Sequence, residues 1–155
     1  MKKKKVSDKI ITNARARFDY EITRAVVAGI VLTGAETKSL RYGHAIMRGA
    51  FVRLKSDGAW LENMQVNPLK TNAAHLPEET RLRPRKLLLK SKEIEQLEAD
   101  NKSGLQIVPL RAFTTGRFIK IELGVGRGKK LYDKRASIKE RDEKRSLHRD
   151  LKSAK

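Results

Sequence analysis

The sequence has no cysteine, only four prolines and few aromatic residues: one tryptophan, three tyrosines and four phenylalanines among 155 residues. Without cysteine the chain forms no disulfides, thiolate zinc sites or iron–sulfur clusters and has no cysteine nucleophile. The longest apolar stretch, residues 25–32, is too short to span a bilayer, and the N-terminal lysines are not followed by a signal-peptide core. These absences predict a soluble, cytoplasmic protein.

Histidine is also scarce. The three histidines, His44, His75 and His148, have neither the spacing of metal ligands nor a neighbouring carboxylate pattern. We therefore expect all three in loops or on the surface. We expect no metal site, no cofactor and no enzymatic activity.

Acidic residues are outnumbered two to one, with 36 Lys and Arg against 18 Asp and Glu, so the formal net charge is +18. Residues 1–17 contribute +6, residues 81–92 contribute +6 and residues 127–155 contribute +7, whereas residues 18–80 and 93–126 together contribute −1. Like charges gathered in this way repel one another and destabilise the fold. Three basic blocks around a neutral body therefore predict a polyanionic partner.

Nucleic acid is the polyanion that these blocks favour. The Arg-rich block at residues 81–92 suits bidentate recognition of phosphate. An anionic membrane is better served by an amphipathic helix with bulky apolar residues opposite the lysines, and no basic block has a Trp- or Phe-rich face. The run Lys2–Lys5 also fits a second interpretation, a solubilising frayed terminus.

Between Phe18 and Val125 the apolar residues alternate with a period of two, the period of a β-strand. The predicted strands lie at residues 18–22, 28–32, 52–54, 60–66, 105–113 and 117–125. Asp57-Gly58 and Thr115-Gly116 are typical turns of two hairpins. We predict a mainly β fold, a six-stranded antiparallel OB-like barrel with short flanking helices, because closure removes exposed strand edges.

Helical periodicity occurs at two places in this body, Glu36–Leu40 and Leu87–Leu97. In an alternative interpretation, Ser91 caps a shorter helix. Residues 67–84 carry three prolines and show little periodicity. They predict a loop that is either mobile or functional.

The C-terminal segment, residues 131–155, has a different composition: fourteen of its 25 residues are charged and five are large and apolar. Such a segment does not form its own core. In a helix, five basic side chains would follow one face and Glu140 would pair with Lys144. The five are Lys134, Arg141, Arg145, Arg149 and Lys152. The segment is thus either a helix suited to an anionic groove or a disordered, solubilising tail.

Four motifs are specific enough to suggest a family. They are Asn13–Arg17, Ala28–Leu32 followed by Gly34–Arg41, Arg83–Leu89, and Gly128–Arg135. In order and spacing they resemble the SsrA-binding protein family, also called small protein B, which binds transfer-messenger RNA in bacterial ribosome rescue. The resemblance covers the chain from Asn13 to Arg149.

The resemblance implies an OB-like body that holds the tRNA-like domain of transfer-messenger RNA and is monomeric when free. It divides the chain into a body with a basic N-terminal arm, residues 1–130, and a tail, residues 131–155, that is disordered when free and helical on the ribosome. There the tail is expected to contact rRNA of the decoding centre and mRNA channel, in place of codon–anticodon pairing. The protein itself is expected to catalyse no reaction.

The matched motifs also imply the contacting side chains. The implied RNA-binding residues are Asn13, Arg15, Arg17, Lys38, Ser39, Arg41, Arg83, Arg85, Lys129 and Lys130. The implied ribosome-engaging residues of the tail are Asp133, Lys134, Arg135, Arg141, Arg145 and Arg149. Structural interpretations compete with these: Asn13 is a candidate turn cap, and Arg85 is a candidate solvated surface residue.

Three positions depart from the family pattern. Val27 stands where an acidic residue usually precedes Ala-Gly, Thr80-Arg81 stands where Asp-Pro usually precedes the arginines, and Gly34–Thr37 differs from the usual Gly-Thr/Trp-Glu-Val. These departures leave open an RNA contact at position 27 and the shape of the loop before Arg83. They do not alter the order of the motifs.

Two other functions stay open at this point. A small structural or ribosomal RNA-binding protein has the same barrel, basic blocks and extension, and composition does not distinguish it. An RNA-processing enzyme needs a carboxylate cluster or a histidine pair, and the body offers neither at a recognisable spacing.

Overall fold

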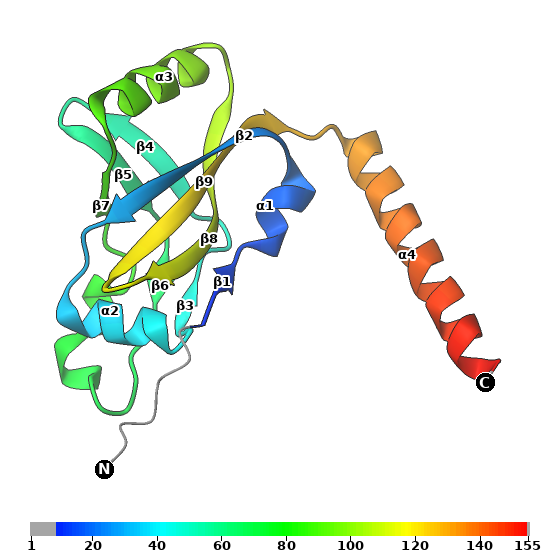
Figure 1. Cartoon of the computed structure of the whole chain (residues 1–155), viewed down its shortest axis with the longest axis horizontal. Coiled ribbons are helices and arrows are strands. Elements are labelled where there is room, and N and C mark those ends of the chain that lie inside the picture. Colours follow the sequence, from blue (N-terminus) through cyan, green and yellow to red (C-terminus); the bar gives the residue numbers. More distant parts are fainter. Residues whose placement is uncertain (1–8, 155) are drawn as a thin grey trace.

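The computed structural model describes residues 9–154, so the run Lys2–Lys5 lies outside the described residues. Antiparallel strands form the body, as predicted, and a long helix extends away from it (Figure 1). A seven-stranded sheet has the order β1-β8-β9-β2-β7-β5-β4, and β3 and β6 form a separate pair. The strands are β1 (Ile11–Thr12), β2 (Tyr20–Ile30), β3 (Ala45–Ile46), β4 (Phe51–Lys55), β5 (Gly58–Glu62), β6 (Gln65–Val66), β7 (Arg85–Leu88), β8 (Gln106–Thr115) and β9 (Phe118–Gly128).

Both predicted hairpins are confirmed. β4 pairs with β5 across a two-residue loop, Ser56–Asp57, and Gly58 follows with a φ of 128°. β8 pairs with β9 across a loop in which Gly116 has a φ of 60°. Glycine adopts these positive φ values readily because it has no Cβ to clash with the backbone.

The two strands predicted at residues 18–22 and 28–32 are wrong as separate elements, because they belong to one long strand, β2. β2 pairs with β9 along its length, and the register shifts between Ile22 and Arg24. At this shift the Thr23 hydroxyl donates to the Val125 carbonyl at 3.0 Å. A bulge bends a strand without ending it, so the residues predicted as a turn lie within the strand.

The sheet also has more strands than predicted, and it is not closed. Merging two predicted strands into β2 removes one strand, whereas β1 and β7 add two. These two contain only two and four residues, too few to show a period of two. Within residues 9–154 no hydrogen-bonded ladder joins the edge strands β1 and β4. The predicted six-stranded barrel is therefore corrected to an open antiparallel sheet of seven strands.

The helices lie at the ends of this sheet. Those described are α1 (Ala14–Asp19), α2 (Gly34–Arg41), α3 (Ser91–Lys102), α4 (Leu131–Ser153) and the 3-10 turns η1 (Ala73–His75) and η2 (Glu78–Thr80). α2 begins with a capping box, in which the Glu36 N–H donates to Thr33 Oγ1 at 3.3 Å and the Thr33 N–H donates to the Glu36 carboxylate at 2.9 Å. α3 is the shorter helix of the alternative interpretation, because residues 85–88 pair with β5 and β2 as β7, but its N-cap is Lys90 and Ser91 is its first helical residue.

The main core fills the inside of the sheet and takes a leucine from each of three flanking segments: Leu40 of α2, Leu97 of α3 and Leu76 of the loop before β7. A smaller cluster packs Ala16 of α1 against Val108 and Leu110 of β8. α4 contributes no buried residue to either cluster. The described core of the body therefore contains no residue of the tail helix. No helix within residues 9–154 is long and apolar enough to cross a membrane.

Candidate nucleic-acid interface

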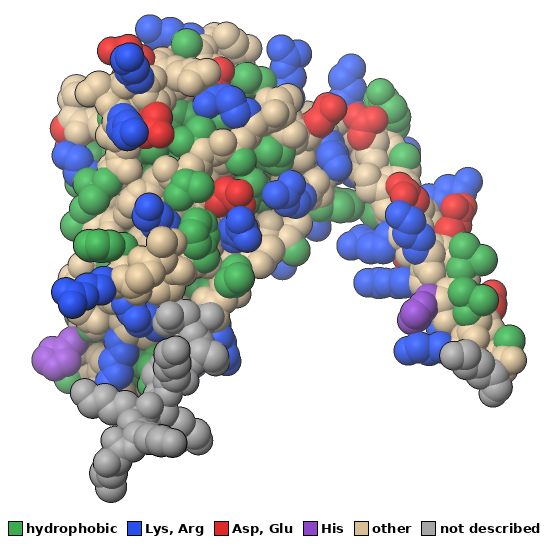
Figure 2. Space-filling view, viewed as in Figure 1, with side chains coloured by type: hydrophobic (Ala, Val, Ile, Leu, Met, Phe, Trp, Pro, Cys, Tyr) green, Lys and Arg blue, Asp and Glu red, His purple; other side chains and the backbone are tan. Residues whose placement is uncertain are grey.

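The structure sorts the ten predicted RNA-binding side chains by exposure. The four exposed residues are Arg15, Arg17, Lys38 and Lys130. The three partly exposed residues are Arg41, Arg83 and Lys129, and the three buried residues are Asn13, Ser39 and Arg85. Lys and Arg side chains are spread over the face of the body and along the tail in Figure 2. The candidate interface therefore consists of seven basic side chains, and the buried three need another explanation.

One part of the interface lies on α1. Arg15 Nε is 3.1 Å from Asp19 Oδ2, and the Arg15 guanidinium lies 4.7 Å from the centre of the Phe18 ring. Arg17 is exposed in the last turn of the same helix, where a positive charge is favoured by the helix dipole. α1 thus presents two arginines, one of which is oriented by an acidic and an aromatic neighbour.

A second part lies at the end of α2. Lys38 Nζ donates to Thr71 Oγ1 at 3.0 Å, and Arg41 Nη2 donates to the Arg117 carbonyl at 2.9 Å. Lys38 therefore lies against the loop before β7, and Arg41 against the β8–β9 hairpin. Hydrogen bonds to oxygen atoms of neighbouring segments thus orient both side chains at the end of α2.

A buried ionic cluster connects α2 to β7. Arg83 Nε and Nη2 donate to the two Glu36 carboxylate oxygens at 2.9 and 2.6 Å, and Arg85 Nε donates to Glu36 Oε1 at 2.9 Å. Arg85 also donates to the carbonyls of Met64, Arg83 and Arg81 at 2.7, 3.2 and 3.1 Å. The side chains of Arg85 and Glu36 are 0% and 1% exposed.

Burial and hydrogen bonding act in opposite directions on the titration of this cluster. Burial tends to raise the pKa of Glu36, but the hydrogen bonds from Arg83 and the Thr33 N–H and the charge of Arg85 together hold that pKa below its usual value. Burial lowers the pKa of Arg85, and Glu36 opposes the change. Glu36 thus favours its charged form between two guanidinium groups, and the cluster of one carboxylate and two arginines keeps a net charge of +1.

Three of the predicted RNA-binding residues are buried. Arg85 supplies its donors to the cluster, so its interpretation as a solvated surface residue is wrong. Asn13 Nδ2 donates to the carbonyls of Met47 and Pro109 at 3.2 and 3.0 Å. Ser39 Oγ accepts from Asn72 Nδ2 at 3.0 Å. These side chains are directed into the protein, where their polar atoms satisfy buried backbone and side-chain groups.

The link between body and tail has open space around its backbone. A Cβ placed on Gly128, the last residue of β9, would meet no atom within 4 Å. The Lys129 N–H donates to the Asp19 carbonyl at 2.8 Å, and the exposed Lys130 directly precedes α4. Two lysines therefore follow a backbone position that a phosphate can approach closely.

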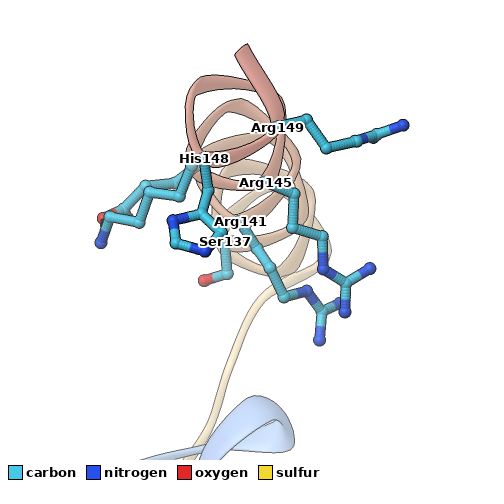
Figure 3. Close-up of a pocket in the computed structure, with 7 residues that line it drawn as sticks. Ser137, Arg141, Arg145, His148 and Arg149 are labelled. Atoms are coloured by element: carbon cyan, nitrogen blue, oxygen red, sulfur yellow. Dashed lines mark hydrogen bonds and ion pairs between the residues drawn. The ribbon is translucent and has the colours of Figure 1, made fainter. Parts of the chain in front are cut away.

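The ribosome-engaging residues predicted in the tail lie along α4. Asp133 and Lys134 are partly exposed, and Arg135, Arg141, Arg145 and Arg149 are exposed. Arg141 and Arg145 extend from one side of the helix, whereas Arg149 points in another direction (Figure 3). The predicted pair of Glu140 and Lys144 is confirmed, with 2.7 Å between Oε1 and Nζ. The arginines of the tail thus cover more than one face of the helix.

The tail also contacts two side chains of the body, Asp19 and Phe18, that sequence analysis did not single out as site residues. Lys134 Nζ lies 3.3 Å from Asp19 Oδ1, and the Arg141 guanidinium lies 5.7 Å from the centre of the Phe18 ring. Trp60 was missed as well, although it has Lys55 and Lys86 within 5.1 and 5.9 Å of its ring. In the sequence, Phe18 and Asp19 directly follow the basic motif Asn13–Arg17. That position does not predict contacts with residues more than a hundred positions away.

The arrangement fits the binding of a polyanion. The three histidines are exposed, as predicted. Residues 9–154 contain no group of three or more histidine or acidic side chains that could hold a metal ion. The described candidate site consists of Lys and Arg side chains of the body and of the tail helix.

A protein-family model described as SmpB protein matches residues 10–153 of the chain. An SsrA-binding protein of Gloeobacter violaceus is 42% identical over 146 residues, which cover 92% of this chain and 93% of that protein. An SsrA-binding protein of Chlorobium chlorochromatii is 47% identical over 139 residues, which cover 88% of this chain and 87% of that protein.

A solved structure is similar as well. A chain from a structure described as "tmRNA-SmpB: a journey to the center of the bacterial ribosome" superposes with a TM-score of 0.65 and 37% sequence identity. The match covers 79% of this chain and 85% of that chain. The similarity thus extends to the three-dimensional fold.

Proposed function

The chain belongs to the SmpB protein family, and from this membership we propose that it binds transfer-messenger RNA and delivers it to stalled ribosomes for trans-translation. The observation that carries the proposal is the extent of the family match, which includes both the body and the tail. A structural ribosomal protein would have the same basic blocks and extension but not this family match, so it is the weaker alternative. Binding and delivery require no catalysis, and we propose an RNA carrier in the cytoplasm rather than an enzyme.

The body is proposed to hold the tRNA-like domain of the RNA. Its binding residues would be the exposed cations of α1, α2 and the β9–α4 link, together with Arg83. The support is their exposure and their attachment to a rigid sheet, because cations on fixed elements recognise the shape of a phosphate backbone. Asn13, Ser39 and Arg85 would act indirectly, by holding α1, α2 and the loop before β7 in position.

The tail is proposed to engage the ribosome, in the empty decoding centre and mRNA channel. α4 has 23 residues, which at 1.5 Å per residue give a length of about 35 Å. None of its residues is buried, and a helix without packing support is marginal in water. This supports a tail that is disordered in the free, monomeric protein and becomes helical where rRNA neutralises its arginines.

A salt series tests the proposed RNA binding. We expect the affinity for a folded RNA of the tRNA-like domain to fall steeply with salt, because bound cations displace condensed counterions. About five phosphate contacts give a log–log slope of about −3.5 to −4.5. The control is an RNA duplex of equal length, which the protein should bind more weakly at every salt concentration. Equal affinities for the two RNAs, or a slope shallower than about −1, would contradict the proposal.

A further inference from the structure

A cleft of about 440 Å³ lies where the tail helix leaves the body. Its walls are β1 and α1 on one side, β3 and the residues after it on another, and α4 opposite. The concave space between the body and the tail helix is visible in Figure 2, with Lys and Arg side chains of the tail projecting into it. The cleft therefore joins two parts of the chain that are far apart in sequence.

The walls of the cleft are positively charged. Arg15 of α1, Arg48 after β3 and Arg141 of α4 all line it, and no acidic residue does. Asp19 lies nearby, but it is paired with Arg15 and with Lys134 at 3.1 and 3.3 Å. Among residues 9–154, neither Arg48 nor Arg141 forms an ion pair with a carboxylate. Charge complementarity thus favours an anion in the cleft.

The cleft also offers an apolar surface. Phe18 lies between two of its arginines, with Arg15 at 4.7 Å and Arg141 at 5.7 Å from the ring centre. Ile46, which also lines the cleft, is 48% exposed. A ring and an aliphatic side chain beside guanidinium groups suit the stacking of a nucleobase, whereas a simple inorganic anion would not use them.

We propose that this cleft binds a ribose-phosphate segment of RNA, with Arg48 and Arg141 on phosphates and Phe18 against a base. The inference rests on the proposed function. It adds Arg48 and Phe18 to the interface and gives Arg141 a partner between body and tail. A segment bound there contacts both walls, so it fixes the angle at which the tail helix leaves the body.

Binding measurements test this site in the full-length protein. Arg48→Gln and Arg141→Gln each remove one cleft cation, and Lys102→Gln, exposed in the last turn of α3 and outside the three basic blocks, removes a charge elsewhere. The two probes are an RNA of the tRNA-like domain and isolated small ribosomal subunits. With the probe that fills the cleft, we expect each cleft variant to bind about tenfold more weakly and its salt slope to flatten by about 0.7 to 0.9.

The matched variants separate the possible outcomes. Lys102→Gln should change affinity less than twofold, and Arg48→Lys should retain most of the wild-type affinity because it keeps the charge. Loss with one probe only identifies the RNA that supplies the segment. If both cleft variants match Lys102→Gln with both probes while the wild type still prefers the tRNA-like RNA, the cleft proposal is overturned and the proposed function stands. A wild type without that preference overturns the proposed function instead.

A distance measurement tests the bridging directly. The chain has no cysteine, so Glu95→Cys in α3 and Ser146→Cys in α4 give two unique positions for spin labels. We expect the distribution of distances between the labels to narrow when the cleft-filling RNA is added. The narrowing should be lost in the Arg48→Gln and Arg141→Gln backgrounds. A distribution of equal width with and without RNA would overturn the proposal.

Discussion

Arg83 and Arg85 belong to one basic motif but face different environments. In a strand successive side chains point to opposite faces, so Arg85 lies on the same inward face as the buried Leu87. There Glu36 and three backbone carbonyls accept its hydrogen bonds. Arg83 precedes the strand and keeps a third of its side chain exposed while sharing the same carboxylate. One glutamate thus anchors an internal arginine and orients a surface arginine.

Breaking this cluster should destabilise the fold. Glu36→Gln leaves a buried guanidinium without its counter-charge, and we expect the free energy of unfolding to fall by about 3 to 5 kcal/mol. Denaturant titration at neutral pH measures the loss. Arg85→Met removes the buried charge but leaves Glu36 paired with Arg83, so it should cost less than Glu36→Gln. An unchanged unfolding free energy for Glu36→Gln would contradict the role given to the cluster.

The same glutamate predicts a dependence on pH. Because its pKa in the folded state lies below the ordinary value of 4.5, the folded state favours the carboxylate more than the unfolded state does. The stabilisation is complete above about pH 4.5, declines below it, and is absent once the pH is below the folded-state pKa. We expect Glu36→Gln to flatten the acid limb of the stability–pH curve. An identical acid limb in the variant would count against the cluster.

Exposed cations should behave in the opposite way. Lys38 and Arg41 make their described hydrogen bonds to neutral oxygens near the surface, and their replacement leaves no buried charge. We expect Lys38→Ala with Arg41→Ala to weaken binding to the tRNA-like RNA by about 1 to 3 kcal/mol with a nearly unchanged melting temperature. Filter binding and thermal unfolding measure the two effects. A large drop in melting temperature with intact affinity would make these residues structural.

At the scale of elements, β2 and β9 approach closely where β2 is bulged. A Cβ on Gly126 would lie 2.0 Å from the Glu21 carbonyl oxygen, a backbone atom that moves only with the strand. Glycine is therefore required at this position for the two strands to pair through the register shift.

Gly126→Ala should separate the strands locally. We expect a loss of about 1 to 3 kcal/mol in unfolding free energy, the usual cost of overpacking. Gly128→Ala is the matched control two residues later, where a Cβ meets no atom within 4 Å, and it should change stability by less than about 0.5 kcal/mol. Thermal unfolding of the two variants compares them. Equal melting temperatures would show that the strands adjust at no cost.

Sequence predicted the elements whose signals are local. The two hairpins have turn residues between alternating strands, and α2 has a capping box within four residues. The bulge at Thr23 depends on the pairing of β2 with β9, and its residues have the same composition as a turn. The sequence therefore predicts two strands where the structure has the single strand β2. The burial of Arg85 was likewise unpredictable, because it depends on Glu36, 49 positions away. Motif order located the basic surface, but only the sheet register decided which side chains reach it.

At the scale of the whole molecule, the structure separates a body with two apolar clusters from a helix that adds to neither. The described side-chain contacts between them are Lys134 with Asp19 and Arg141 with Phe18. Both are polar, partly exposed contacts on the first turns of the helix, and such contacts contribute little to stability. The body's fold should therefore be independent of the tail, whereas the tail's position should depend on what is bound.

Removing residues 131–155 tests this division. We expect the truncated protein to keep its melting temperature, because no buried residue is lost. Its affinity for the tRNA-like RNA should fall by no more than the loss caused by Arg141→Gln, since the other proposed contacts are in the body. The truncated protein should still deliver the RNA to stalled ribosomes but fail to support tagging of the nascent chain, and charge reversal of Asp133, Lys134 and Arg135 should give a milder form of this defect.

Two measurements on the full-length protein complete the test. In the free protein the tail amides should show sharp, random-coil NMR signals, and these should shift to helical positions and broaden on small ribosomal subunits. Full tagging by the truncated protein would contradict the proposed role of the tail on the ribosome. Helical tail signals in the free protein would contradict the proposed disorder.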